Sequence, residues 1–131
     1  MADPKITLTE NDYLRLDHIL GYGEFEDLEF EVSRANVIAA EEVTSDLVTM
    51  HSLFKYHNLT DDKIGEMTIV YPDEANLDER KISVLAPLGS ALIGLREGDE
   101  VEWPFPDGSL KRLKVLKVLS SGREGQGKTY H

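Results

Sequence analysis

The chain has 131 residues, of which 40% are hydrophobic and none is cysteine. This length suits one compact domain with a small appendage, and the missing cysteines exclude disulfides, thiolate catalysis and Cys-ligated metal sites. A net charge of −11 argues against direct, sequence-specific nucleic-acid binding, because phosphate contacts need Lys and Arg.

The charge is unevenly spread along the chain. Residues 1–62 hold 14 Asp and Glu against 4 Lys and Arg, whereas residues 63–131 hold 11 against 10. An acidic half can seek a basic protein surface, although solubility alone also accounts for it. No apolar run approaches the ~18 residues of a membrane span, and no secretory signal is visible. We expect a cytoplasmic monomer with no membrane contact.

The first segment has the pattern of a helix. Thr9 provides an N-cap hydroxyl, and acidic residues follow it in the first turn. The apolar residues Tyr13, Leu16 and Leu20 then recur at i, i+3 and i+7. Gly21 is placed to end this helix.

A second helical pattern follows after a short connection, residues 21–27. Its apolar positions are spaced as in a heptad seam: Leu28, Val32, Ala35, Ala39 and Val43. Two amphipathic helices joined so closely predict an antiparallel hairpin over residues 1–44.

The pattern then changes to β. The expected strands, separated by polar turns, cover residues 47–56, 65–71, 81–85, 100–103 and 110–119. A short helix is expected over 87–95, where Pro87 stands at a first-turn position. Turns rather than crossover helices join most strands, which predicts an antiparallel sheet and an α+β fold. We therefore expect a helical hairpin over 1–44, a sheet domain over 45–119 and a flexible tail over 120–131.

Few residues carry recognisable chemistry. The four histidines show no metal-ligand spacing, and no nucleophile motif is present, so we expect no catalytic residues, no metal site, no cofactor and no enzyme. The acids Glu24, Glu26 and Asp27 crowd the expected hairpin tip. They can stabilise the start of the second helix, bind Mg²⁺ or meet basic residues of a partner.

A group of cations lies near the C-terminus: Lys111, Arg112, Lys114 and Lys117. It fits either a solvated sheet face or a docking patch for an acidic partner.

Two stretches resemble known families. Residues 83–99, SVLAPLGSALIGLREGD, resemble the C-terminal domain of the Gre transcript-cleavage factors, and residues 101–119 continue the match. Residues 46–52, DLVTMHS, together with residues 68–72, TIVYP, resemble the regulator of nucleoside diphosphate kinase (Rnk) family. The resemblance covers roughly residues 6–119.

This resemblance implies a short N-terminal antiparallel coiled-coil hairpin on an FKBP-like antiparallel β-sheet domain with one short helix. It also implies an RNA polymerase-binding regulator that docks at the secondary channel, competes with Gre factors and affects nucleotide metabolism indirectly. The docking residues would be Leu85, Ala86, Pro87, Leu88 and Ser90. Gre factors often carry Asp-Ser before this proline, where the present chain has Leu-Ala.

Two alternatives remain open at this point. A Gre-like cleavage stimulator would need a hairpin long enough to bring its tip acids to the polymerase active site. Each arm here looks far shorter than a Gre arm. A peptidyl-prolyl isomerase would need its scattered aromatic residues to converge on one cavity: Phe54, Tyr56, Tyr71, Trp103 and Phe105.

Overall fold

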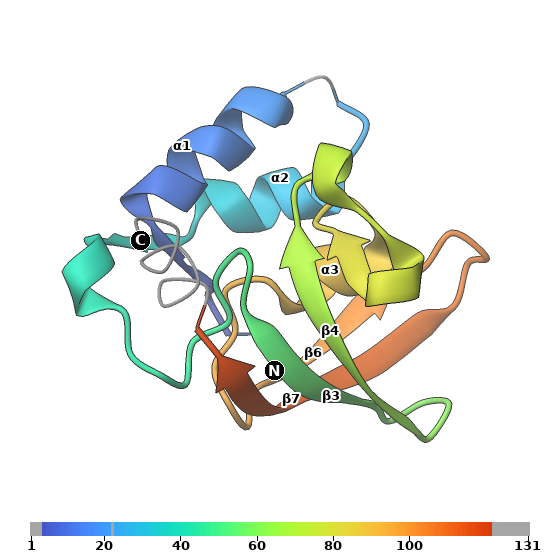
Figure 1. Ribbon diagram of the computed structural model, residues 1–131. Coiled ribbons are helices and arrows are strands. Elements are labelled where there is room, and N and C mark those ends of the chain that lie inside the picture. The colour runs from blue at the N-terminus through green and yellow to red at the C-terminus, as the bar shows by residue number, and fades with distance from the viewer. Residues whose placement is uncertain (1–3, 22, 122–131) are drawn as a thin grey trace.

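The computed structural model describes residues 4–21 and 23–121, and shows a mixed α+β fold (Figure 1). Its helices are α1 (Glu10–Ile19), α2 (Glu26–Ser33) and α3 (Pro87–Leu92). Its strands are β1 (Thr7–Thr9), β2 (Asn36–Ile38), β3 (Leu53–Asn58), β4 (Lys63–Val70), β5 (Lys81–Ser83), β6 (Glu100–Pro104) and β7 (Leu110–Ser120). Short 3₁₀ turns occupy Ala40–Glu42, Pro72–Glu74 and Leu77–Glu79.

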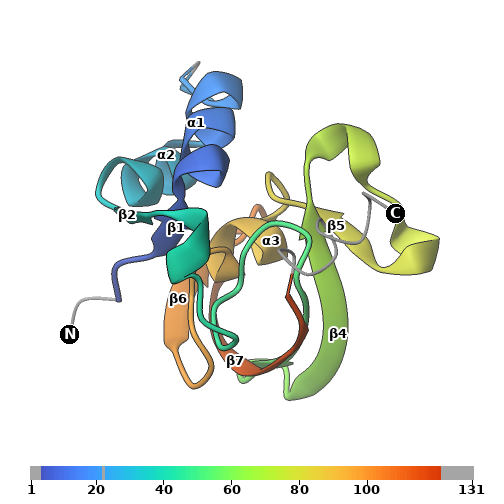
Figure 2. The same cartoon turned by 60° about the vertical axis from the view of Figure 1, so that its left-hand side comes forward.

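Five strands form the main sheet in the order β5-β4-β3-β7-β6. Figure 2 shows that this sheet curls strongly, with α3 beside its concave side. Three of the strand pairs are antiparallel, as expected, but β5 runs parallel to β4. The expectation of a wholly antiparallel sheet was therefore wrong, because residues 71–80 carry the chain back before β5 begins.

The helical hairpin rests on an apolar seam. The Thr9 hydroxyl caps α1 by accepting a hydrogen bond from the Asp12 amide at 3.1 Å, which confirms the expected helix start. Leu16 and Leu20 point inward and pack in the same core cluster as Leu28 of α2. In Figure 1, α1 runs to the tip and α2 returns beside it.

The second helix is shorter than its sequence pattern predicts. It ends at Ser33, so Ala35, Ala39 and Val43 do not continue a helical seam, and that expectation was wrong. The reason is a competing backbone pairing. The Asn36 amide donates to the Ile6 carbonyl at 2.9 Å, and β2 then runs parallel to β1.

Backbone hydrogen bonds fix the hairpin to the sheet domain. The Thr7 amide donates to the Gly94 carbonyl, and the Gly94 amide donates to the Val48 carbonyl, both at 2.9 Å. Gly94 has φ +79°, and a Cβ placed there would lie 2.7 Å from the Cβ of Ile6. Only glycine allows this backbone approach without displacement of the N-terminal segment.

One expected strand begins later than predicted. Residues 47–50 are buried but irregular, with a single bridge from Leu47 to Arg96, and β3 starts only at Leu53. Between them His51 adopts φ +70°, which reverses the chain before the strand. No helix in the described part of the chain is long and apolar enough to cross a membrane.

Candidate docking surface

Residues 85–90, here called the docking segment, form the entry to α3. Ala86 is the N-cap and Pro87 the first helical residue, where a missing amide hydrogen costs nothing. The Ser90 hydroxyl donates to the Val84 carbonyl at 2.7 Å and is buried, so it holds the segment in place. Leu85, Ala86, Pro87 and Leu88 are all partly exposed.

A groove of about 370 Å³ separates the hairpin tip from this segment. It is lined by residues 24–28, Leu85, Pro87, Ser90 and residues 103–106. We call it the tip groove. It brings together two sets of residues that the sequence placed far apart, the tip acids and three members of the docking segment.

Leu88 lies on the other side of the docking segment. It borders a second pocket of about 330 Å³ whose walls include Tyr56, Leu77 and Ile82. Leu77 has 78% of its surface exposed. The docking segment is therefore a ridge between two depressions, each lined by a mixture of apolar and polar side chains.

The tip acids do not project away from the body of the protein. Glu24, Glu26 and Asp27 are exposed on the rim of the tip groove. The ten residues of α1 span only about 15 Å. Among the residues that the structure describes, these three carboxylates form no ion pair, and no group of three or more acids or histidines is arranged to hold a metal.

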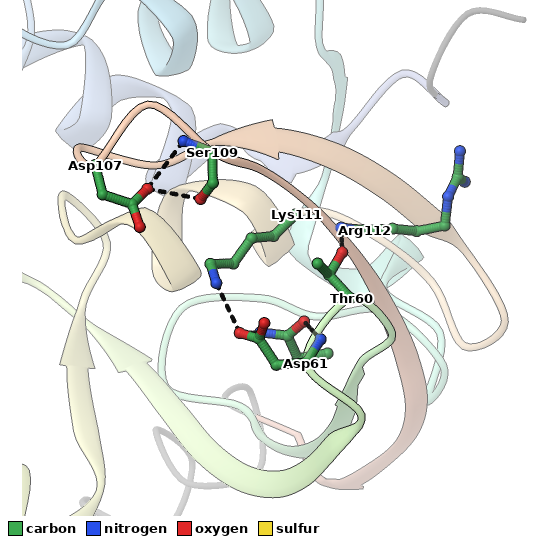
Figure 3. Close-up of polar contacts among 7 residues, drawn as sticks. Thr60, Asp61, Asp107, Ser109, Lys111 and Arg112 are labelled. Atoms are coloured by element: carbon green, nitrogen blue, oxygen red, sulfur yellow. Dashed lines mark hydrogen bonds and ion pairs between the residues drawn. The ribbon is translucent and has the colours of Figure 1, made fainter.

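Two of the four cations on β7, Lys111 and Arg112, form ion pairs within the chain, and Figure 3 shows the contact of Lys111. Lys111 Nζ lies 2.7 Å from Asp61 Oδ2, and this hydrogen bond raises the pKa of Lys111 and lowers that of Asp61. Arg112 contacts Glu100 at 3.3 Å and Glu102 at 3.5 Å. These two cations are therefore less available to an acidic partner than the sequence suggests.

A polar cluster centred on the buried residues Asp12 and Tyr71 joins α1 to the sheet domain. Asp12 accepts hydrogen bonds from the Met50 amide at 3.2 Å and the Tyr71 hydroxyl at 3.4 Å. Burial raises the pKa of the Asp12 carboxyl, although these hydrogen bonds oppose the shift. Arg15 lies 3.8 Å above the Tyr71 ring, and His51 Nε2 lies 2.9 Å from Glu74. The contacts of Asp12 with Met50 and Tyr71 fix the hairpin on the sheet domain.

The five aromatic residues that an isomerase pocket would need are dispersed. Phe54 is fully buried in the core, and Tyr56 borders the second pocket. Tyr71 contacts α1, while Trp103 and Phe105 line the tip groove. They do not converge on one cavity, so the condition set for a peptidyl-prolyl isomerase is not fulfilled.

Sequence reasoning missed two features of the structure. It did not pair Phe25 and Leu28 with the wall formed by residues 103–106, and it did not foresee the Asp12 cluster. The stretch Trp-Pro-Phe-Pro, which runs from the end of β6 into an exposed turn, was the available signal for the wall, since loops positioned by a rigid scaffold often carry binding residues. No local pattern marks Asp12, whose partners are 38 and 59 positions away.

Comparisons with known proteins agree with this architecture. Residues 43–120 match the family "Transcription elongation factor, GreA/GreB, C-term". The regulator of nucleoside diphosphate kinase of Escherichia coli is 36% identical over 124 residues, which cover 90% of this chain and 91% of the relative. Transcription elongation factor GreA of Prosthecochloris aestuarii is 41% identical over 95 residues, 71% of this chain and 59% of the relative.

A solved structure extends the likeness to three dimensions. A GreA/GreB transcription elongation factor from Nitrosomonas europaea superposes with a TM-score of 0.68 at 39% identity, covering 88% of this chain and 98% of the other. The chain belongs to the regulator of nucleoside diphosphate kinase family and carries a GreA/GreB-type C-terminal domain.

Proposed function

We propose that this protein is a non-enzymatic regulator that binds RNA polymerase at the secondary channel and competes there with Gre factors. Its effect on nucleotide metabolism would be indirect, through transcription. It would act in the cytoplasm as a monomer, without a cofactor and without direct contact to a nucleic-acid sequence.

The observation that carries the proposal is the docking ridge. Leu85, Pro87 and Leu88 are partly exposed between two depressions that apolar side chains line in part, and α3 fixes their backbone. A rigid apolar ridge with adjacent depressions can bury surface on a partner with little ordering cost. The likeness to proteins named transcription elongation factors supports polymerase as that partner.

The proposal includes the finer architecture. The sheet domain, residues 45–119, would be FKBP-like and would carry the docking ridge. Residues 1–44 would be a separate unit in which α1 and α2 pack as a short coiled-coil hairpin. The tail, residues 120–131, lies almost entirely outside the described residues.

The proposal is tested by measuring the affinity of the wild type and of two matched proline variants for core RNA polymerase. Pro87→Asp should weaken binding at least tenfold, because it places an unpaired charge in a dehydrated contact. Pro72→Asp is the control, since Pro72 also begins a short helical turn but lies outside both depressions. Equal binding of the two variants and the wild type would contradict docking at the ridge.

Transcript cleavage separates a blocker from a cleavage stimulator. Added to a backtracked elongation complex, the protein should not accelerate cleavage, because a hairpin of about 15 Å keeps its tip acids beside the docking ridge. It should slow cleavage that a Gre factor stimulates. Cleavage that rises with the wild type and is lost in Glu26→Ala would instead support a catalytic tip.

A further inference from the structure

We propose that the tip groove is the part of the docking surface that sets partner specificity: it receives an apolar side chain from a polymerase segment whose neighbouring Lys or Arg residues pair with the tip acids. This inference rests on the proposed function and adds a role for Glu24, Glu26 and Asp27 in docking.

The walls of the groove suit an apolar side chain. Phe25 and Leu28 come from the hairpin, Leu85 and Pro87 from the docking segment, and Trp103 and Phe105 from the opposite wall. All six are apolar or aromatic. Burial of an apolar side chain against them gives binding energy in proportion to the area removed from water.

Charge selects among possible occupants. Several acids elsewhere in the chain pair with one of its own cations, as in Asp46–Arg96 and Asp61–Lys111. The three tip acids have no such cation among the described residues. Their field disfavours nucleic acid and favours a protein segment with Lys or Arg beside its apolar residue.

The acids are held in position by the fold. Leu28 is 1% exposed and anchors the first turn of α2 in the core. The Phe25 amide donates to the Glu29 carboxylate at 3.4 Å, which fixes the residue between the acids. At the opposite end of the groove, Lys111 lies 5.5 Å from the Phe105 ring, but its charge is paired with Asp61.

The test compares two triple variants that remove the same charge. Glu24→Gln/Glu26→Gln/Asp27→Asn neutralises the groove rim with nearly isosteric side chains. Asp17→Asn/Asp73→Asn/Asp78→Asn neutralises three exposed acids that do not line the groove. Affinity for core RNA polymerase is measured from 50 to about 300 mM salt, with circular dichroism to confirm that each variant is folded.

The rim variant should bind at least tenfold more weakly at low salt and show a shallower salt dependence, while the control variant stays within about twofold of the wild type. Equal affinities for all three folded proteins would overturn the inference but leave the proposed function standing. Tighter binding by the rim variant would also overturn it. If the wild type itself fails to bind polymerase, the proposed function fails as well.

Discussion

Gly89 offers a direct way to disturb the docking ridge from inside the protein. A Cβ at this position would overlap the Ser83 carbonyl oxygen and lie 3.1 Å from both the Ser83 carbonyl carbon and the Val84 Cα. These are backbone atoms, so α3 itself must move by a few tenths of an ångström or more. Overpacking of this kind lowers the free energy of unfolding by about 3 kcal/mol at the upper end of its range. Replacing a helical glycine by alanine raises it by about 1 kcal/mol, because the unfolded chain loses conformational freedom.

Gly89→Ala should therefore lower the free energy of unfolding by about 2 kcal/mol, or Tm by roughly 6–10 °C. Because Pro87 moves with α3, affinity for polymerase should fall too. Gly65→Ala is the control. The nearest atoms to its Cβ would belong to the Tyr56 side chain, with the hydroxyl oxygen at 3.0 Å, and that side chain can shift. Urea denaturation and calorimetry measure both variants. An unchanged or raised Tm for Gly89→Ala would refute the close packing of α3 on β5.

The hairpin and its buried acid give two further predictions. Leu20→Ala should lower the free energy of unfolding, measured by denaturant titration, by about 2–4 kcal/mol. Leu14→Ala, at a residue 65% exposed, should change it by less than about 0.5 kcal/mol. Similar effects of the two substitutions would mean that the helix phase is wrong. The raised pKa of Asp12 means that the folded state retains a proton longer than the unfolded state. The contribution of this retained proton to the free energy of unfolding is therefore fully present below the ordinary pKa of 3.8. It is lost as the pH rises through the pKa of Asp12 in the folded protein. Wild type should accordingly lose stability relative to Asp12→Asn as pH increases from 4 towards 7, and parallel pH curves would show that this carboxyl does not titrate abnormally.

Local patterns predicted the elements that depend on local chemistry. The Thr9 cap, the inward faces of Leu16 and Leu20, and the start of α3 at Pro87 all follow from neighbours within one or two turns. The strands β4, β6 and β7 also lie close to their expected ranges, because apolar alternation and the turns around them are local signals.

The shortened second helix and the parallel strand pair involve partners distant in sequence. The apolar spacing through Val43 allowed a longer helix, but pairing of β2 with β1, some 30 residues earlier, ended α2 at Ser33. The parallel β4–β5 pair depends in the same way on the path of residues 71–80. The tip groove also required tertiary structure, since it joins residues 24–28 to residues 85–90 and 103–106. The sequence indicated the tip acids and the docking segment separately, and the tertiary structure was needed to show that they lie beside one another.

The most direct test of the account is displacement of a fluorescently labelled Gre factor from core RNA polymerase. Increasing amounts of this protein should displace the label completely, and the apparent Kd of the Gre factor should rise in linear proportion to the added protein, as mutually exclusive binding requires. Pro87→Asp should displace it only at concentrations at least tenfold higher. A complex in which polymerase holds both proteins at once, with the affinity for the Gre factor unchanged, would contradict a shared site at the secondary channel.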